Sequence, residues 1–142
     1  MIRKILLPLL LFTFLTTAIK SQTDEPHIRF ETKTSKVDIK SGEEFYVLVN
    51  MDIDKHWYTY DFVDQISSEG IGPNTTEIVV LSAELAESNG DVLKPTPLKK
   101  FDEGFEMDVT YYKGNFDVIV PLKALKDITI GKDDLEIEVY LQ

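Results

Sequence analysis

An apolar side chain occupies every second position from Phe45 to Ile53, and this alternation constrains the fold more than any other feature of the sequence. Successive side chains of a β-strand point to opposite faces of a sheet. The spacing therefore places one set of side chains on a single face, namely Phe45, Val47, Val49, Met51 and Ile53. It predicts a long strand with one face in a hydrophobic core.

Shorter apolar or alternating runs lie on both sides of this strand and are separated by turn signals. Strands are predicted at Ile28–Thr32 and around Val37 and Ile39. Another is predicted at Thr76–Leu81, whose apolar residues on both faces indicate a central position in a sheet. The run Leu135–Leu141 alternates again and predicts a closing strand.

Two further alternating runs flank a turn signal at Lys113–Asn115. Phe105–Tyr112 before it and Phe116–Leu122 after it are good candidates for a β-hairpin. Single helical turns are predicted within Ser82–Asn89 and around Lys123–Lys126.

The remaining segments favour loops. Lys99–Gly104 mixes both charge signs and is expected to be exposed, and Asp61–Thr76 is dense in turn residues. Seven or eight short strands without a sustained helical period predict an all-β fold, an antiparallel β-sandwich of immunoglobulin-like type. We expect one domain over residues 23–142, without internal repeats.

The first 22 residues have the composition of an export signal. Arg3 and Lys4 form a basic start, and the uncharged, mostly apolar run Ile5–Ile19 follows. That run is short for a membrane span, which needs ~20 residues. We expect a signal peptide over residues 1–22 and no membrane span in the mature chain; an uncleaved N-terminal anchor is the alternative.

Composition excludes several classes of function. The formal net charge of −10 argues against nucleic acid or an anionic membrane as a partner, because phosphate groups require clustered Lys and Arg. The sequence has no cysteine, which removes disulfides, thiolate ligands and thiol catalysis from these residues. His27 and His56 do not make a metal site by themselves, and the paired carboxylates flank turns or line exposed faces. We therefore expect no metal, no cofactor and no self-sufficient enzyme activity.

The long strand leads into the aromatic stretch Lys55–Asp61, which holds the only tryptophan. Continued alternation places Trp57 on the core face and Tyr58 and Tyr60 on the other face. We interpret Trp57 as a core anchor, since aromatic residues are enriched in strands. A sharper interpretation is that Tyr58 and Tyr60 also form the floor of a binding surface.

Aromatic side chains are the main candidates for partner recognition, because tyrosine offers a large, stiff contact area with a polar tip. About half of them should be core residues or cross-strand pairs in so small a sandwich. The candidates are Tyr58, Tyr60, Phe105, Tyr111, Tyr112 and Tyr140.

Several motifs, taken in order, resemble the family of N-terminal periplasmic domains of the thiol–disulfide interchange protein DsbD. They are the strand opening Lys40–Phe45, the W-x-x-Y motif Trp57–Tyr60, the loop Gly72–Thr76, Pro95 and Pro97, Tyr112–Gly114 ahead of Phe116–Leu122, and the closing strand Leu135–Gln142. The resemblance covers residues 27–142 and depends on the order and spacing of individually loose motifs. A Trp57 far from the interior would count against it.

The resemblance implies an immunoglobulin-like domain of the periplasm that passes electrons from a membrane-embedded partner to disulfide isomerases and other thioredoxin-like proteins. In the family this exchange uses two cysteines just after the closing strand, shielded by an aromatic cap loop. The sequence departs from the family in two places. Tyr58 follows Trp57 where the family usually has histidine, and the sequence ends at Gln142, about where the first cysteine is expected.

The same resemblance gives approximate places to the candidate binding residues. Phe105 and Met107 would lie near the cap loop. Tyr111, Tyr112 and Tyr140 would lie near the position of the missing cysteine pair.

Three hypotheses follow from these observations. The first is an exported, non-catalytic domain that binds thioredoxin-like partners or is left from a truncated electron carrier. The second is a portion of a working thiol–disulfide oxidoreductase whose cysteines lie downstream; an in-frame cysteine pair past codon 142, followed by membrane spans, would favour it. The third is an unrelated secreted sandwich for adhesion or envelope assembly, favoured by a pull-down without redox proteins.

Overall fold

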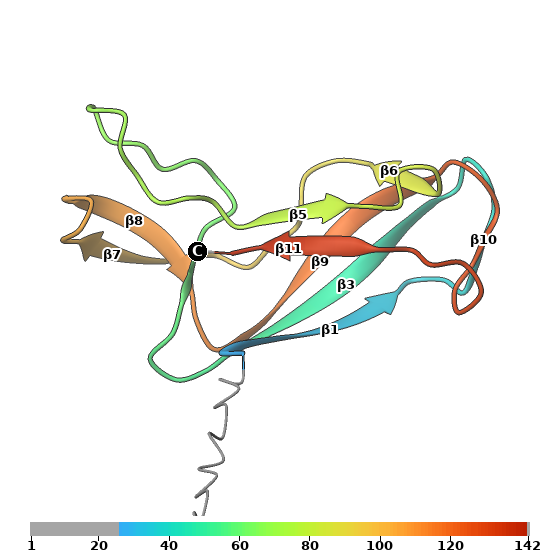
Figure 1. The fold of residues 1–142 in the computed structure, drawn as a ribbon, viewed down its shortest axis with the longest axis horizontal. Helices are drawn as coiled ribbons and strands as arrows, with labels where there is room; N and C mark the ends of the chain where they lie inside the picture. The colour runs from blue at the N-terminus through green and yellow to red at the C-terminus, as the bar shows by residue number, and fades with distance from the viewer. Residues whose placement is uncertain (1–25, 142) are drawn as a thin grey trace, which may run out of the picture.

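The computed structural model describes residues 26–141, which form eleven β-strands and no helix (Figure 1). The expected signal peptide, residues 1–22, lies outside the described residues. Within them, no helix is long and apolar enough to cross a membrane. The strands are β1 (Ile28–Thr34), β2 (Asp38–Ile39), β3 (Glu44–Ile53), β4 (Thr59–Tyr60), β5 (Glu77–Val80), β6 (Ala86–Ser88), β7 (Leu98–Asp102), β8 (Met107–Tyr112), β9 (Asn115–Ala124), β10 (Ile128–Thr129) and β11 (Ile137–Tyr140).

A four-stranded antiparallel sheet in the order β1-β3-β9-β6 forms the larger layer. Strands β3 and β9 pair from Glu44↔Lys123 to Asp52↔Asn115. The alternation predicted for β3 is confirmed, because its five apolar residues are all buried. Residues opposite each other on paired strands share a face, so β9 adds Val118, Val120 and Leu122 to the same core.

The second layer is an antiparallel pair of β5 and β11, which lies over this sheet in Figure 1. Its inward side chains Ile78, Val80, Ile137 and Val139 pack against the buried residues of β3 and β9. At one end, Ile39 of β2 and Ile128 of β10 are paired and almost fully buried. The predicted all-β, immunoglobulin-like antiparallel sandwich is thus confirmed.

A three-stranded sheet in the order β4-β8-β7 lies at the opposite end of the molecule from β10 (Figure 1). Strand β8 pairs with β4 through Tyr60↔Tyr111 and with β7 through Lys100↔Val109. This small sheet and the connections next to it carry most of the aromatic residues singled out from the sequence.

The hairpin predicted around Lys113–Asn115 is wrong. Strand β8 pairs with β4 and β7, whereas β9 pairs with β3 and β6. Gly114 has a φ of +72°, a conformation that glycine adopts without a steric cost, and its carbonyl accepts a hydrogen bond from the Ile53 N–H (3.0 Å). The turn therefore redirects the chain from one sheet into another.

Three other local predictions also need correction. Lys99–Gly104 was expected to be an exposed connection, but most of it belongs to β7. Strand β5 is not central, because among the strands of residues 26–141 it pairs only with β11, and Val79 is exposed. The helical turn expected around Lys123–Lys126 is absent, because β9 continues to Ala124. The single turn expected within Ser82–Asn89 does form: the Leu85 and Ala86 N–H groups donate to the Ser82 carbonyl (2.8 and 3.2 Å), and strand β6 follows it.

Candidate functional site

Four of the predicted binding residues come together on one face of the β4-β8-β7 sheet, and we call Tyr58, Tyr60, Phe105 and Tyr111 the aromatic cluster. The Tyr58 ring meets the Tyr60 and Tyr111 rings edge-on, with 5.5 Å between centroids in both pairs. The Phe105 ring lies 6.1 Å from the Tyr60 ring. Edge-to-face packing at these distances is favourable.

Strand register explains why these side chains meet. Tyr60 and Tyr111 are cross-strand partners, so their side chains share a face. Lys100 is opposite Val109, two residues from Tyr111, and therefore shares that face too.

A lysine and an aspartate hold the aromatic cluster together. Lys100 Nζ lies 3.6 Å from the Tyr58 ring centroid and 3.3 Å from Asp102 Oδ2. The Tyr60 hydroxyl donates a hydrogen bond to the same carboxylate oxygen (2.9 Å). A cation over a tyrosine ring contributes about 0.5–2 kcal/mol, depending on its exposure to water.

These contacts set the ionisation of the groups involved. Burial raises the pKa of the Tyr60 hydroxyl, and its hydrogen bonds with Tyr58 and Asp102 act in the same direction. Lys100 lowers the pKa of the neighbouring Tyr58 hydroxyl. Burial alone would raise the pKa of Asp102, but hydrogen bonds from Tyr60 and Lys100 outweigh it and hold that pKa below its usual range. The carboxylate is thus kept ionised beside a protonated lysine.

Trp57 is not the core anchor that continued alternation predicted. Its side chain is 50% exposed and stacks on the His27 ring, with 3.9 Å between centroids and 15° between planes. The Trp57 N–H donates to the Asp54 carbonyl (3.0 Å), and His56 has a φ of 77°. This turn breaks the two-residue period, so Trp57 lies on the surface beside the aromatic cluster.

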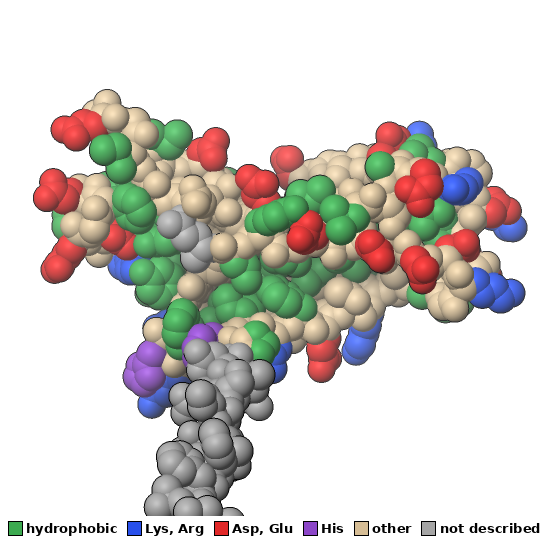
Figure 2. All heavy atoms as spheres, viewed as in Figure 1, with side chains coloured by type: hydrophobic (Ala, Val, Ile, Leu, Met, Phe, Trp, Pro, Cys, Tyr) green, Lys and Arg blue, Asp and Glu red, His purple; other side chains and the backbone are tan. Residues whose placement is uncertain are grey.

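The exposed Trp57 borders two shallow grooves. The larger, about 690 Å³, is also lined by Tyr58, Tyr111, Lys100 and Lys113. The smaller, about 360 Å³, lies between His56, Trp57, Tyr58 and Tyr60. Figure 2 shows the histidines (purple) at this end of the molecule.

The sequence model of one family, described as thiol:disulfide interchange protein DsbD, N-terminal, matches residues 26–142. The chain belongs to this family. Neither the curated proteins nor the solved structures include a significant match to the chain.

The chain belongs to the DsbD N-terminal family although Trp57 is exposed. The expectation that family membership requires a buried Trp57 was therefore wrong. The sequence of this DsbD N-terminal domain contains no cysteine. Within residues 26–141, no group of three or more His, Asp or Glu side chains is arranged to hold a metal ion.

The remaining predicted binding residues of this DsbD N-terminal domain lie apart from the aromatic cluster or at its margin. Tyr112 is buried on the opposite face of β8, where its ring stacks on Phe116 at 4.8 Å and its hydroxyl donates to the Pro95 carbonyl (2.9 Å). Tyr140 is 48% exposed on β11, hydrogen-bonded to Glu138. Met107 is half-buried and shares the face of Tyr111 by alternation along β8.

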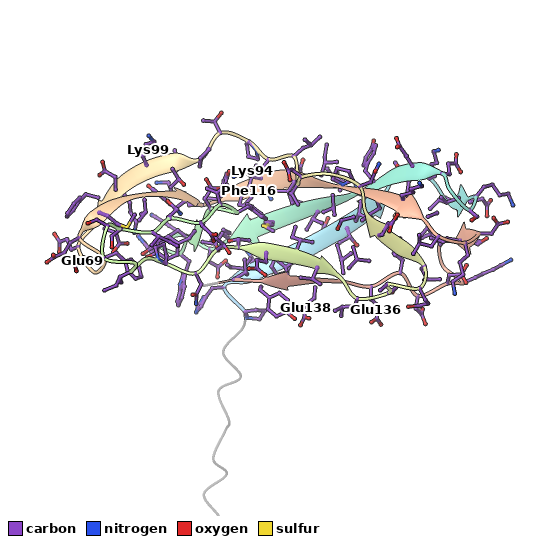
Figure 3. All side chains as sticks on the ribbon, turned by 90° about the horizontal axis from the view of Figure 1, so that it is seen from above. Glu69, Lys94, Lys99, Phe116, Glu136 and Glu138 are labelled. Atoms are coloured by element: carbon purple, nitrogen blue, oxygen red, sulfur yellow. The ribbon has the colours of Figure 1, made fainter. Side chains whose placement is uncertain are left out.

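A buried ion pair on the far side of β8 supports the small sheet, and sequence analysis missed it. Lys94 binds Asp61, whose side chain is only 3% exposed, and the ammonium lies 5.9 Å from the Tyr112 ring centroid. Figure 3 shows Lys94 in the region of Phe116, on which Tyr112 stacks. Neither residue stands in a local pattern that distinguishes it from an exposed charge.

Lys100 and Asp102 were also missed, because they fall in the charged run that was expected to be an exposed connection. No local pattern identifies them, because the apolar residues of β7, Leu98 and Phe101, are three positions apart and so do not alternate on one face. The ion pair between Lys100 and Asp102 and their contacts with tyrosines offset part of the cost of burying their charges.

Proposed function

We propose that this domain is an exported binding module of the periplasm that docks thioredoxin-like proteins through the aromatic cluster and Trp57. Membership of the DsbD N-terminal family supports this class of partner. The basic start and apolar run of residues 1–19 support export. The observation that carries the proposal is the half-exposed Trp57 beside four packed aromatic rings.

The chemistry of these side chains suits protein recognition. Tryptophan and tyrosine are enriched among the residues that contribute most to binding energy at interfaces. Tyr60 is 8% exposed and bonded to Asp102, so it fixes the rings around it before a partner arrives. A surface that is already ordered loses less conformational entropy on binding.

Thiol–disulfide interchange needs a thiolate as nucleophile and a second sulfur as its target. Residues 1–142 supply neither, so we assign to them the docking of a partner and not the exchange itself. The Tyr60 hydroxyl and the Lys100 ammonium both contact the Asp102 carboxylate, so in this proposal these polar groups stabilise the aromatic cluster and take no part in chemistry.

Isothermal titration calorimetry tests the docking surface. The probe is a periplasmic thioredoxin-like protein with its active-site cysteines replaced by serine, so that only non-covalent binding is measured. Trp57→Ala and Phe105→Ala should each weaken binding about tenfold or more, as expected for aromatic residues at the centre of an interface. Phe101→Ala is the matched control, because Phe101 is 61% exposed on the opposite face of β7.

Equal affinities of the wild type and the Trp57→Ala and Phe105→Ala variants would contradict the proposal. A large fall in the melting temperature of Phe105→Ala would assign that ring to the core instead. Tyr140→Ala tests whether the docking surface extends to β11; the aromatic cluster alone predicts no effect there.

A further inference from the structure

Strand β1 presents a core-type face that the second layer leaves uncovered. Its even-numbered residues lie opposite the buried residues of β3, with Phe30 opposite Met51 and Thr32 opposite Val49. Cross-strand partners share a face, so these side chains point toward the sandwich interior. Yet Met51 is 0% exposed while Phe30 is 40% exposed. A layer of two strands, β5 and β11, is too narrow to cover all of the four-stranded sheet.

Strand β11 turns a free edge toward this uncovered face. The Leu81 N–H donates to the Glu136 carbonyl (2.9 Å), and the register continues with Glu138 opposite Val79. In an antiparallel pair the hydrogen-bonded positions alternate, so Ile137 and Val139 direct their N–H and C=O groups away from β5. In the described part of the chain, β11 pairs with no strand other than β5.

A groove of about 660 Å³ separates the uncovered face of β1 from the free edge of β11. Thr32, Thr34 and Val47 line it from the larger sheet, and Leu135 and Ile137 line it from the second layer. Figure 2 shows hydrophobic side chains in the hollow between β11 and β1. Free backbone groups beside an uncovered apolar face are what an added strand needs.

The rim of the groove indicates the charge of its occupant. Asp133, Asp134 and Glu136 line it on the side of β11, whereas Lys33 is the cation among its lining residues. A second copy of the chain is disfavoured, because each copy has a net charge of −10 and would bring its own Glu136 and Glu138 against this rim. A basic segment is complementary to it.

We propose that the groove between β1 and β11 accepts one added β-strand from a partner protein, an extended segment in which apolar residues alternate with lysine or arginine. Its backbone pairs with Ile137 and Val139. Its apolar side chains cover Phe30, and its cations face Glu136 and Glu138. The groove shares no residue with the aromatic cluster or with Trp57. This proposal can therefore be refuted without refuting the proposed docking of thioredoxin-like proteins, and the reverse also holds.

Amide hydrogen exchange followed by NMR tests the pairing directly. The probe is a capped heptapeptide that alternates lysine with valine, added to the folded protein in excess. Exchange of the Ile137 and Val139 amides should slow about tenfold or more, because these donors become bonded. Exchange at Glu138, which is already paired with β5, should change less than about twofold.

Control peptides and variants separate strand addition from general adhesion. The peptide with glutamate in place of lysine, and the lysine peptide N-methylated at alternate residues, should each bind about tenfold more weakly. Phe30→Ala should weaken binding about fivefold or more. Tyr46→Ala is the matched control, since Tyr46 is 45% exposed on the opposite face of β3.

Three results would overturn the proposal. The first is unchanged exchange at Ile137 and Val139 under saturating peptide. The second is equal binding of the lysine and glutamate peptides. The third is exchange at these amides that slows with protein concentration in the absence of peptide, which would assign the groove to a second copy of the chain.

Discussion

Replacing Asp61 with asparagine should destabilise the domain through the buried ion pair under β8. The Asp61 carboxylate accepts hydrogen bonds from Lys94, from Thr110 Oγ1 (2.8 Å) and from the Phe62 N–H (2.7 Å). Asparagine keeps the shape but removes the charge that neutralises Lys94. Removing one partner of a buried ion pair costs about 3–5 kcal/mol. The Lys94 side chain is 21% exposed and can turn partly toward water, so we expect about 2–4 kcal/mol here.

Thermal unfolding followed by circular dichroism measures this loss. For a domain of this size, about 1 kcal/mol shifts the melting temperature by about 4 °C, so Asp61→Asn should lower it by about 8–16 °C at pH 7. Asp64→Asn is the control, because Asp64 is exposed. The double variant Asp61→Asn/Lys94→Met should lose less stability than the two single changes added together, since the second change removes the unpaired charge.

The effect of Asp61→Asn should depend on pH in a defined direction. Burial alone would raise the pKa of Asp61, but hydrogen bonds from Lys94, Thr110 and Phe62 outweigh it and hold the pKa below its ordinary value of 3.8. The folded state therefore binds fewer protons than the unfolded state, and this stabilisation is complete above the unfolded-state pKa and lost as pH falls through the folded-state pKa. The difference in melting temperature should be full at pH 7 and shrink below about pH 4. A variant within about 3 °C of the wild type at pH 7, or a difference that grows on acidification, would refute the reasoning.

Two further substitutions test the small sheet and the main core by urea denaturation. Tyr60→Phe removes the hydroxyl that donates to Asp102 and should lower the free energy of unfolding by about 1–2 kcal/mol. The control Tyr46→Phe, at an exposed site, should lower it by less than about 0.5 kcal/mol. Equal losses of stability in the two variants would mean that the Tyr60 hydroxyl contributes nothing. Leu122→Ala at a 0% exposed position should cost about 2–5 kcal/mol, and Leu125→Ala at a 43% exposed position much less; similar values would place the core elsewhere.

The parts of the fold that sequence predicted are those decided by local periodicity. The two-residue period of β3 identified the strand, its length and its buried face together, because one side of it contacts the core along its whole length. The closing strand was predicted for the same reason, and Ile137 and Val139 do pack inward. An all-β class follows from such patterns without knowledge of which strands are neighbours.

Strand pairing was not predictable in this way. Strands β8 and β9 each alternate as expected, but their shared turn carries the chain between sheets, and β9 pairs with a strand more than sixty residues earlier in the sequence. Strand β7 was missed because its lysines resemble those of an exposed loop. Contacts with Tyr58 and Asp102 stabilise the Lys100 charge within the folded sheet, and neither contact is visible from the local sequence.

The candidate site was predicted in part. Tyr58, Tyr60, Phe105 and Tyr111 do meet. Alternation correctly placed Tyr60 and Tyr111 within strands, which are β4 and β8. The error at Trp57 arose from extending the same alternation through Asp54–His56, where the chain turns. Histidine is enriched among non-glycine residues with a positive φ, but His56 alone does not reveal that the chain turns at this position.

The contacts within the aromatic cluster decide which substitutions can separate docking from folding. Tyr60 is nearly buried and bonded to Asp102, so a change there reduces stability and obscures any change in affinity. Trp57 is half-exposed and stacks on His27 at the surface, so its removal takes away contact area for a partner without opening the core. An affinity lost at Trp57 with an unchanged melting temperature therefore assigns docking to this surface, whereas a parallel loss at Tyr60 does not.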